Sequence, residues 1–410
     1  MRRREFLEAA GITALAGLGA GCAARKTASA APPPAARPTS LQLAVPRISW
    51  ERVIRTTVGL RPHRDSGFVL KPEKFDEKTV IHDYGFGGAG MSLAWGCGAM
   101  AAGIALEHSG RRAAVLGCGS PGLTAARQLQ RRGFEVTIYT MTVPPDTTSN
   151  MSWAGFTPTT ALIANERRTP AWDAQFRQAA ETSYRELQLM AGEPGSGVYW
   201  IDGYTATDEE PAAASGHPGE GELLPDYLRP ERDRQIFGPG EHPFPTKYAI
   251  RRPSLAIEPS IYLDALMRDF LMFGGKIVIR KFDTPRDLMS LTESIVVNCT
   301  GLGSKTLFGD DELVPIKGQL TLCIPQPELD YRAFHDRAMI NPRRDGLVVG
   351  NLADRGNASL EVDEAVRKAN MEAAMQFFGA MRPPAAGVRV TRSMPPAVPP
   401  GLESFYGRDS

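Results

Sequence analysis

The clearest alternation of apolar and polar positions lies between residues 112 and 140. Residues 112–116 (RAAVL) form a short apolar run that ends at a glycine, a pattern typical of a buried parallel strand. Apolar residues then recur at helical spacing over 123–129 and stop before Gly133, which suits the end of a helix. Residues 134–140 (FEVTIYT) predict a second strand. The pattern therefore predicts a strand, a glycine turn, a helix and a strand in one compact stretch.

The rest of the chain carries longer patterns. Residues 208–245 are crowded with proline, glycine and charged residues, which predicts a long surface loop or lid. The proline-rich tail after residue 383 predicts irregular structure, and no repeat of fixed period is present. The other predicted elements are helices over 172–191 and 260–275, strands over 276–282 and 294–301, and a hairpin over 339–351.

Length and composition restrict the class of protein. The chain has 410 residues, too many for one simple core, which predicts two domains or one large interleaved unit. Hydrophobic residues at 42% and charged residues at 23% are typical of a soluble globular protein. The 47 basic and 46 acidic residues leave no polybasic surface, which excludes a nucleic-acid partner. The five cysteines show no metal-ligand spacing, so we expect no metal site and mostly buried thiols, with a structural disulfide left open.

The N-terminus predicts export. Residues 3–7 (RREFL) fit the twin-arginine pattern, and a weakly hydrophobic run over 9–20 follows, too short to span a membrane. We expect residues 1–30 to be a signal peptide read by the twin-arginine (Tat) translocase, with a frayed N-terminal helix as the alternative. Residues 31–46, rich in alanine and proline, predict a disordered linker. The protein would then be periplasmic or extracellular, with lipid attachment at Cys22 left open.

The turn between the first strand and its helix reads GCGSPG, a GxGxxG motif that predicts a dinucleotide site in this context. Gly117 permits a tight turn, and Gly119 lets the backbone approach a pyrophosphate at the helix N-terminus. Pro121 suits the first helical turn, where its missing N–H costs nothing. A plain tight turn is the alternative. The predicted binding residues here are Gly117, Gly119, Ser120, Pro121 and Gly122.

The end of the second strand leaves the cofactor open. An acidic residue usually bonds the adenosine ribose there, but no acid occurs before Asp146. The hydroxyl of Thr140 is the group available for that contact. The turn by itself does not distinguish FAD from NAD.

Four segments carry a family resemblance. Residues 79–97 (TVIHDYGFGGAGMSLAWGC) resemble the HNYGHGGxGxTxxWGC signature of the D-amino-acid oxidase family of FAD-dependent oxidoreductases. Residues 144–155 (PPDTTSNMSWAG) resemble its TTS/TTT segment, and residues 297–319 (VNCTGLGSKTLFGDDELVPIKGQ) resemble its NCTG…PxxGQ segment. Residues 55–64 (RTTVGLRPHR) resemble its TGxRPxR motif. In familiar members the last motif and the HNYGHGG signature close the chain, so the order here predicts a circular permutation.

The resemblance implies a fold and a domain plan. It predicts an α/β fold with a Rossmann-type FAD-binding domain and an interleaved mixed-sheet substrate domain. The implied boundaries are the FAD-binding domain over 47–165 and 276–305, the substrate domain over 166–275 and 306–385, and an irregular tail over 386–410.

The resemblance also implies roles for residues. Arg61 would bind the substrate carboxylate, and the Gly88 carbonyl would accept from the substrate amine. Backbone N–H groups of residues 85–90 would face the flavin, and the helix from Leu93 onward would add its dipole. The implied cofactor contacts are Gly87, Gly88, Gly90, Met91, Ser92, Thr147, Thr148, Ser149, Thr300 and Gly301.

The implied activity is FAD-dependent oxidation of D-amino acids. The α-hydrogen would leave as hydride to the flavin, the imino acid would hydrolyse, and molecular oxygen would be reduced to hydrogen peroxide. No protein base is required. Asp83, Phe86 and Met339 stand where the family usually has Asn, His and Tyr, which leaves the substrate side chain open, and Tyr331 is not placed by the sequence. The alternatives are another amine or amino acid with a non-oxygen acceptor, an NAD-dependent dehydrogenase, or an inactive flavin-binding protein.

Overall fold

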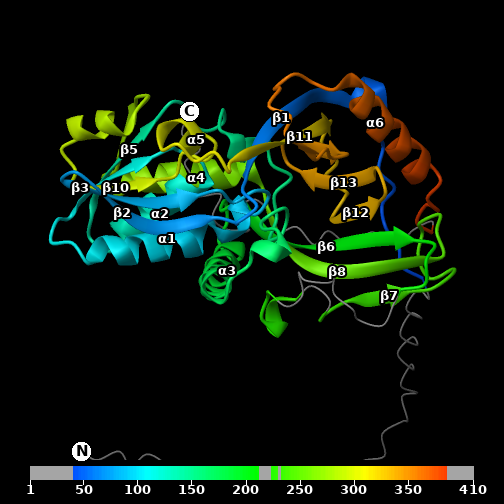
Figure 1. Cartoon of the computed structure of the whole chain (residues 1–410). Helices are drawn as coiled ribbons and strands as arrows, with labels where there is room; N and C mark the ends of the chain where they lie inside the picture. The colour runs from blue at the N-terminus through cyan, green and yellow to red at the C-terminus, as the bar shows by residue number, and fades with distance from the viewer. Residues whose placement is uncertain (1–39, 212–222, 230–231, 386–410) are drawn as a thin grey trace, which may run out of the picture. The chain divides into compact units, whose positions relative to one another are not determined.

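A computed structural model describes residues 40–211, 223–229 and 232–385. The predicted signal peptide and the predicted tail over 386–410 lie outside the described residues, as do parts of the predicted lid. Two β-sheets organise the described chain (Figure 1). Within the described residues, no helix combines the length and apolar character needed to cross a membrane.

The first sheet has six strands and is parallel except at one edge. Its core is the predicted unit β4, α2 (Ser120–Gln130) and β5, which confirms the prediction from hydrophobic spacing. Apolar residues fill both faces of β4, as expected for a strand covered on two sides. β2 is the antiparallel edge strand. In spatial order the strands are β2 (Val69–Phe75), β3 (Lys78–Tyr84), β10 (Ile295–Asn298), β4 (Arg112–Leu116), β5 (Glu135–Thr140) and β9 (Lys276–Ile279).

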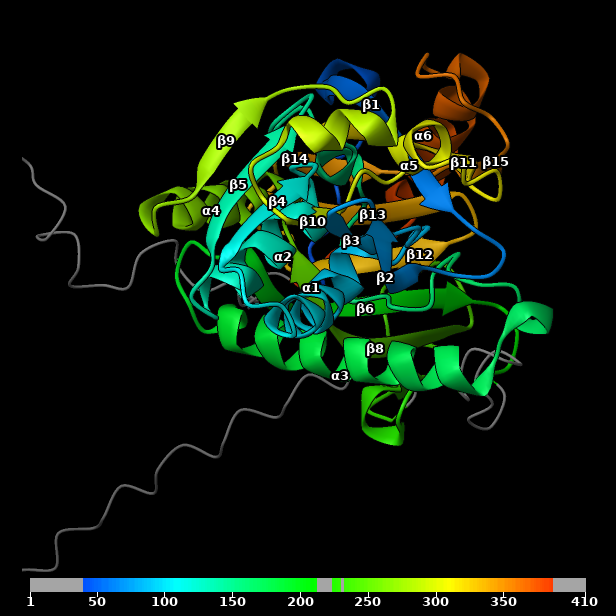
Figure 2. The same ribbon diagram turned by 60° about the vertical axis from the view of Figure 1, so that its left-hand side comes forward.

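Helices bury this sheet. α1 (Gly90–Leu106) is apolar around its circumference and packs against β3, α2 and α3. α3 (Pro170–Ala191) begins at Thr169, whose hydroxyl accepts from the Trp172 N–H, and it runs along α1 and below β6 and β8 (Figure 2). α4 (Pro259–Met272) packs against α2. These helices correspond to the predicted 172–191 and 260–275.

The second sheet has nine strands and is mostly antiparallel. Its core is shared with α6 (Glu364–Gly379), which covers β11, β13 and β14. The predicted hairpin is confirmed as β13 and β14, which turn at Arg344–Asp345. In order the strands are β1 (Val53–His63), β11 (Val314–Cys323), β14 (Gly346–Val349), β13 (Ala338–Arg343), β12 (Tyr331–His335), β6 (Val198–Thr207), β8 (Tyr248–Ile257) and β7 (Gln235–Phe237), with β15 (Asp354–Arg355) beside β11.

Short helical turns complete the described chain. α5 (Gly303–Leu307) follows β10, and Thr284 and Asp287 form a capping box at the start of η5. The 3₁₀ turns are η1 (Trp50–Arg52), η2 (Thr148–Met151), η3 (Asn165–Arg167), η4 (Asp226–Leu228) and η5 (Pro285–Ser290).

The sheets divide the chain differently from the predicted boundaries. β1 was expected in the FAD-binding domain, but it pairs with β11 of the nine-stranded sheet along its whole length. Its partner lies far away in sequence, so local patterns did not reveal this pairing. α3 and α4 were expected in the substrate domain, yet their apolar faces join the core of the six-stranded sheet. Residues 40–46 were expected to be disordered. Instead, Leu43 is buried and the Tyr331 hydroxyl donates to the Ala44 carbonyl, so this segment packs on the second core.

Candidate cofactor and substrate site

A cavity of about 910 Å³ lies between the two sheets. Both glycine-rich segments line it, together with residues from β1, β6, β11 and β12. The chain crosses from β1 to β2 after His63, so the motif around Arg61 is delivered to the boundary between the sheets. This volume is at the upper end of the range for small-molecule sites, which suits an elongated ligand or two adjacent ligands.

The GCGSPG turn is built for close backbone packing. Gly117 has a φ of +102°, and a Cβ there would lie 2.7 Å from the Cys299 carbonyl oxygen. A Cβ at Gly122 would lie 2.0 Å from the Gly117 carbonyl oxygen, so only glycine lets α2 begin so near β4. The Ser120 N–H donates to Ser149 Oγ at 3.0 Å. This contact brings the threonine-rich segment to the N-terminus of α2, where an anion is stabilised by the helix dipole.

N–H groups of the GFGGAG segment bond to the neighbouring backbone and hold the segment in place. The Gly87 N–H donates to the Pro62 carbonyl at 2.8 Å, and the Gly88 N–H donates to the Thr160 carbonyl at 3.1 Å. A Cβ at Gly87 would lie 1.9 Å from the Ala161 carbonyl oxygen. The expectation that the N–H groups of 85–90 face a cofactor is therefore wrong for Gly87 and Gly88, because the neighbouring backbone already takes them.

α1 begins at Gly90, earlier than the expected Leu93. The N–H groups of Gly90 and Met91 have no partner inside the helix, since a helix leaves its first N–H groups unpaired. Both residues line the cavity. These two groups, rather than those of the preceding glycines, are the donors that α1 offers to a ligand.

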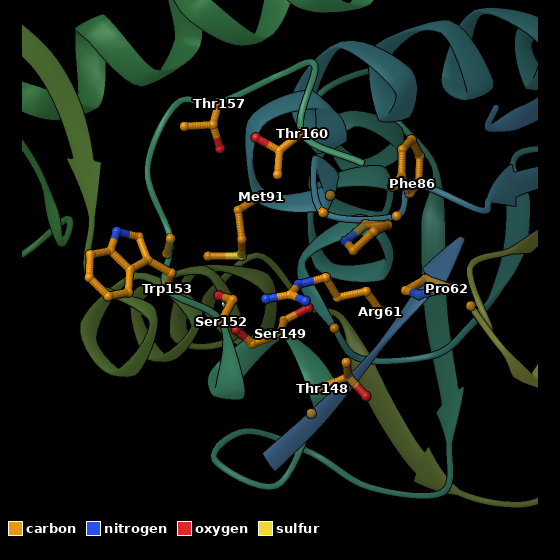
Figure 3. A pocket seen from close by; sticks show the side chains of 18 of the residues that line it. Arg61, Pro62, Phe86, Met91, Thr148, Ser149, Ser152, Trp153, Thr157 and Thr160 are labelled. Carbon is orange, nitrogen blue, oxygen red and sulfur yellow. Dashed lines mark hydrogen bonds between the residues drawn. The ribbon is translucent and has the colours of Figure 1, made fainter. Parts of the chain in front are cut away.

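Arg61 enters the cavity from β1 and is half-buried. Its Nη1 donates to the Leu352 carbonyl and its Nη2 to Asn351 Oδ1, each at 3.0 Å. Burial lowers the pKa of the Arg61 guanidinium from its ordinary value. In Figure 3 its side chain extends toward Met91, Ser149 and Ser152. The geometry presents an oriented cation beside both glycine-rich segments.

Comparison with known proteins decides the family. A family model described as DAO, FAD dependent oxidoreductase, matches residues 112–406, which is most of the chain. The chain belongs to the D-amino-acid oxidase (DAO) family of FAD-dependent oxidoreductases. The match begins at Arg112, the first residue of β4.

Individual relatives share this assignment. A D-amino-acid oxidase of Streptomyces coelicolor is 35% identical over 288 residues, which cover 67% of this chain and 79% of that protein. A D-amino-acid oxidase of Rubrobacter xylanophilus is 28% identical over 284 residues, which cover 68% and 79%. Among solved structures, the glycine oxidase of Geobacillus kaustophilus is similar with a TM-score of 0.49 and 16% identity, covering 67% of this chain and 81% of that one.

FAD is therefore the cofactor, which removes the choice between FAD and NAD left open by the glycine turn. The cavity fits it, because Gly117 and Gly119 line the cavity at the N-terminus of α2 and the hollow continues to Gly87 and Gly88. Gly119, Pro121 and Ser149 would lie beside the pyrophosphate. The predicted residues at this DAO site that line the cavity are Arg61, Gly87, Gly88, Gly90, Met91, Gly117, Gly119, Pro121, Thr140, Thr147, Thr148, Ser149, Thr300 and Gly301.

Three predicted contact residues stand behind the cavity wall. Ser120 and Gly122 lie within the first turn of α2 and support it. Ser92 Oγ donates to the Gly155 carbonyl at 3.0 Å and accepts from the Thr157 N–H at 2.8 Å. Ser92 thus shapes the lining segment 155–157. The Thr140 hydroxyl, expected at the ribose, donates to the Thr142 carbonyl at 2.7 Å.

Residues where this chain departs from the family motifs lie at the site. Phe86 lines the cavity and stacks on Phe68, with ring centroids 5.5 Å apart. Met339 also lines it, whereas Tyr331 faces the core under α6. Asp83 is fully buried, and the Cys299 thiol lies 3.7 Å from its Oδ2. Burial raises the pKa of Asp83 to about 8, so its carboxyl group is largely protonated at neutral pH.

Sequence reasoning missed the substrate side of the cavity. Arg332 and Phe334 point from β12 into it, and alternation along this strand was the available signal. An aromatic group also lines the wall, with Tyr184 and Phe156 ring centroids 5.0 Å apart. The four described cysteines, Cys97, Cys118, Cys299 and Cys323, are buried and free, as expected for apolar packing.

Proposed function

We propose that this FAD-dependent oxidoreductase is an oxidase that deaminates D-amino acids. The supporting observation is Arg61, an oriented guanidinium that faces the cavity beside both glycine-rich segments. A guanidinium offers paired N–H donors to a carboxylate, which fixes the position of the α-carbon. The D-amino-acid oxidases of the two bacterial relatives share the family and support the same substrate class.

Asn351 and Leu352 would orient the Arg61 guanidinium, so that its remaining N–H groups meet the substrate carboxylate. Gly88 would accept from the amine through its carbonyl group. Phe86, packed on Phe68, would exclude water from the same region. FAD, when bound, supplies the capacity to accept a hydride from the α-carbon. The overall change converts the amino acid, oxygen and water into a 2-oxo acid, ammonia and hydrogen peroxide.

The circular permutation belongs to this proposal. The family-model match starts at β4 and leaves the TGxRPxR-like and HNYGHGG-like motifs outside it. Nevertheless β1 pairs with β11, and β3 pairs with β10, so both motifs border the cavity. Sheet pairing therefore supports an unchanged site reached by a different chain order.

Export by the twin-arginine route is proposed from the sequence alone. The RREFL pattern and the small-residue run that follows it support this route. Replacing both Arg3 and Arg4 by Lys should retain the protein in the cytoplasm of an expressing bacterium. Fractionation that finds the double variant outside the cytoplasm as efficiently as the parent would overturn the route.

The deciding experiment is a substrate panel on the purified holoprotein. We expect a flavin absorbance spectrum, and oxygen uptake with peroxide release for D-amino acids but not for their L-enantiomers. Flavin bleaching without peroxide would instead indicate another electron acceptor. Bleaching by amines or L-amino acids, with none by D-amino acids, would overturn the proposal.

A further inference from the structure

One row of the nine-stranded sheet places two arginines on the cavity floor. Arg332 of β12 pairs with Gly203 of β6, and Gly203 pairs with Arg252 of β8. All three residues line the cavity. A Cβ at Gly203 would lie 3.5 Å from the Arg252 carbonyl oxygen and 3.6 Å from the Phe334 ring, so a small residue separates the two arginine positions without crowding.

Arg332 is a buried cation with no counter-ion among the described residues. Its side chain donates from Nε to Asn341 Oδ1 and from Nη2 to the Ala154 carbonyl, both at 2.8 Å. It is 4% exposed, and in the described parts of the chain it forms no ion pair with a carboxylate. Burial lowers its pKa to about 10. A buried charge without a partner of opposite sign is costly, so an anionic group bound in the cavity would stabilise Arg332.

A structural role explains part of this arrangement. Three side chains of β12 and β13 hold three consecutive backbone carbonyls: Arg332 holds that of Ala154, Asn341 that of Trp153 and Arg343 that of Ser152. We call this arrangement the carbonyl clamp. It requires hydrogen-bond donors but no charge, because neutral Asn341 serves equally well.

The charges within the carbonyl clamp differ. Arg343 donates from Nε to Asp345 Oδ1 at 2.7 Å, so its charge is balanced within the protein. Arg343 does not line the cavity, whereas Arg332 does. Arg332 is therefore the clamp residue that faces the cavity, and its charge is the one that a bound anion could balance.

We propose that Arg332 binds a second anionic group of the substrate, so that the preferred substrates are amino acids with a side-chain carboxylate. This inference rests on the proposed function, in which Arg61 holds the α-carboxylate. The two arginines lie on β1 and β12, which β11, β14 and β13 separate within the sheet, and both line the same cavity. In this proposal a diacid spans the cavity between them, while a neutral amino acid of equal size leaves Arg332 unbalanced.

The test compares acids with their isosteric amides on the holoenzyme. We expect kcat/KM for D-glutamate and D-aspartate to exceed those for D-glutamine and D-asparagine. Arg332→Gln keeps hydrogen-bond donors for the clamp but removes the charge, and it should lower this acid-to-amide ratio by about 30-fold. Arg332→Lys should restore part of the ratio. The matched control Arg343→Gln, which removes a charge already balanced by Asp345, should leave the ratio unchanged.

A binding measurement separates this inference from the proposed function. Glutarate and its monoamide, which have no amine to oxidise, should perturb the flavin absorbance with different affinities, and Arg332→Gln should abolish that difference. If no D-amino acid is oxidised but glutarate binding depends on Arg332, the proposed function fails and the subsite stands. If D-amino acids are oxidised with no preference for acids, or if Arg332→Gln lowers acid and amide turnover equally, the subsite is overturned.

Discussion

The guanidinium of Arg61 lies against the backbone of Gly318, where a Cβ would be 2.9 Å from Nη2 and 3.1 Å from Cζ. Gly318 sits inside β11, opposite Gly59 of β1. A glycine in a strand interior often marks a close approach by another group. Here that group is the Arg61 guanidinium, which we propose binds the substrate carboxylate. Gly318 is the glycine of the PxxGQ-like segment within residues 297–319. A glycine is needed there because a side chain would collide with Arg61.

Gly318→Ala should therefore push Arg61 away from its position between Asn351 and Leu352. We expect KM for the amino acid to rise by about 10-fold or more, while the flavin absorbance stays the same. Steady-state kinetics and an absorbance spectrum measure the two effects. Gly379→Ala, at the end of α6 with no atom within 4 Å of the new Cβ, is the matched control. Parent-like kinetics in Gly318→Ala would contradict this account.

Arg61→Ala should lower kcat/KM by about 100-fold, because a charge-assisted bidentate contact with the substrate is lost. Arg61→Lys should recover only part of it, since an ammonium lacks the planar pair of donors. Flavin bleaching under anaerobic conditions measures the reductive half of the reaction directly. Arg55→Ala removes an exposed arginine from the same strand and serves as control. An Arg61→Ala enzyme that reduces its flavin at the parental rate would remove Arg61 from its role.

The buried Asp83 should make stability depend on pH. Burial raises its pKa from 3.8 to about 8, so the folded protein keeps a proton there that the unfolded chain has released. The stability it contributes is present below 3.8 and is lost as the pH rises through about 8. Asp83→Asn should thus gain stability relative to the parent as the pH increases over this window.

Thermal unfolding midpoints at pH 5, 7 and 9 would measure the gap between Asp83→Asn and the parent. Asp264→Asn, at an exposed position of α4, controls for removing one acidic group. A gap that stays constant across the three pH values would show that Asp83 is not protonated in the folded protein.

Gly122→Ala should abolish or strongly weaken FAD binding. Its Cβ would collide with the Gly117 carbonyl oxygen at 2.0 Å, which would separate α2 from the glycine turn. Titration of apoprotein with FAD, followed by flavin fluorescence, reports binding without any substrate. Gly103→Ala within α1 makes the same chemical change where nothing lies within 4 Å. Equal FAD affinity in both variants would mean that the turn does not hold the pyrophosphate.

Local patterns predicted the elements whose signals are local. β4, α2 and β5 follow from period and glycine placement, and α3 and the β13–β14 hairpin follow similarly. The sheet assignment of β1 did not, because its register with β11 joins residues such as Arg61 and Ile316 that are far apart in sequence.

The site shows the same division. The cavity-lining glycines were predicted from motifs, whereas the Gly88 N–H was assigned to a ligand although it bonds the Thr160 carbonyl. Arg332 was missed because its meaning depends on burial and on the absence of a nearby carboxylate among the described residues, which no motif encodes.

The carbonyl clamp links two parts of the fold that could otherwise separate. Residues 147–149 line the cavity beside the GCGSPG turn, and only a few residues later the backbone of 152–154 is fastened to the other sheet. Each hydrogen bond of the carbonyl clamp contributes about 1 kcal/mol to stability. Separating residues 152–154 from β12 and β13 would lose all three of these hydrogen bonds. FAD binding should then raise the melting temperature of the whole described body in one cooperative transition, rather than stabilising the six-stranded sheet alone. Loss of FAD would first loosen the cavity floor around Arg332, which we propose selects the substrate.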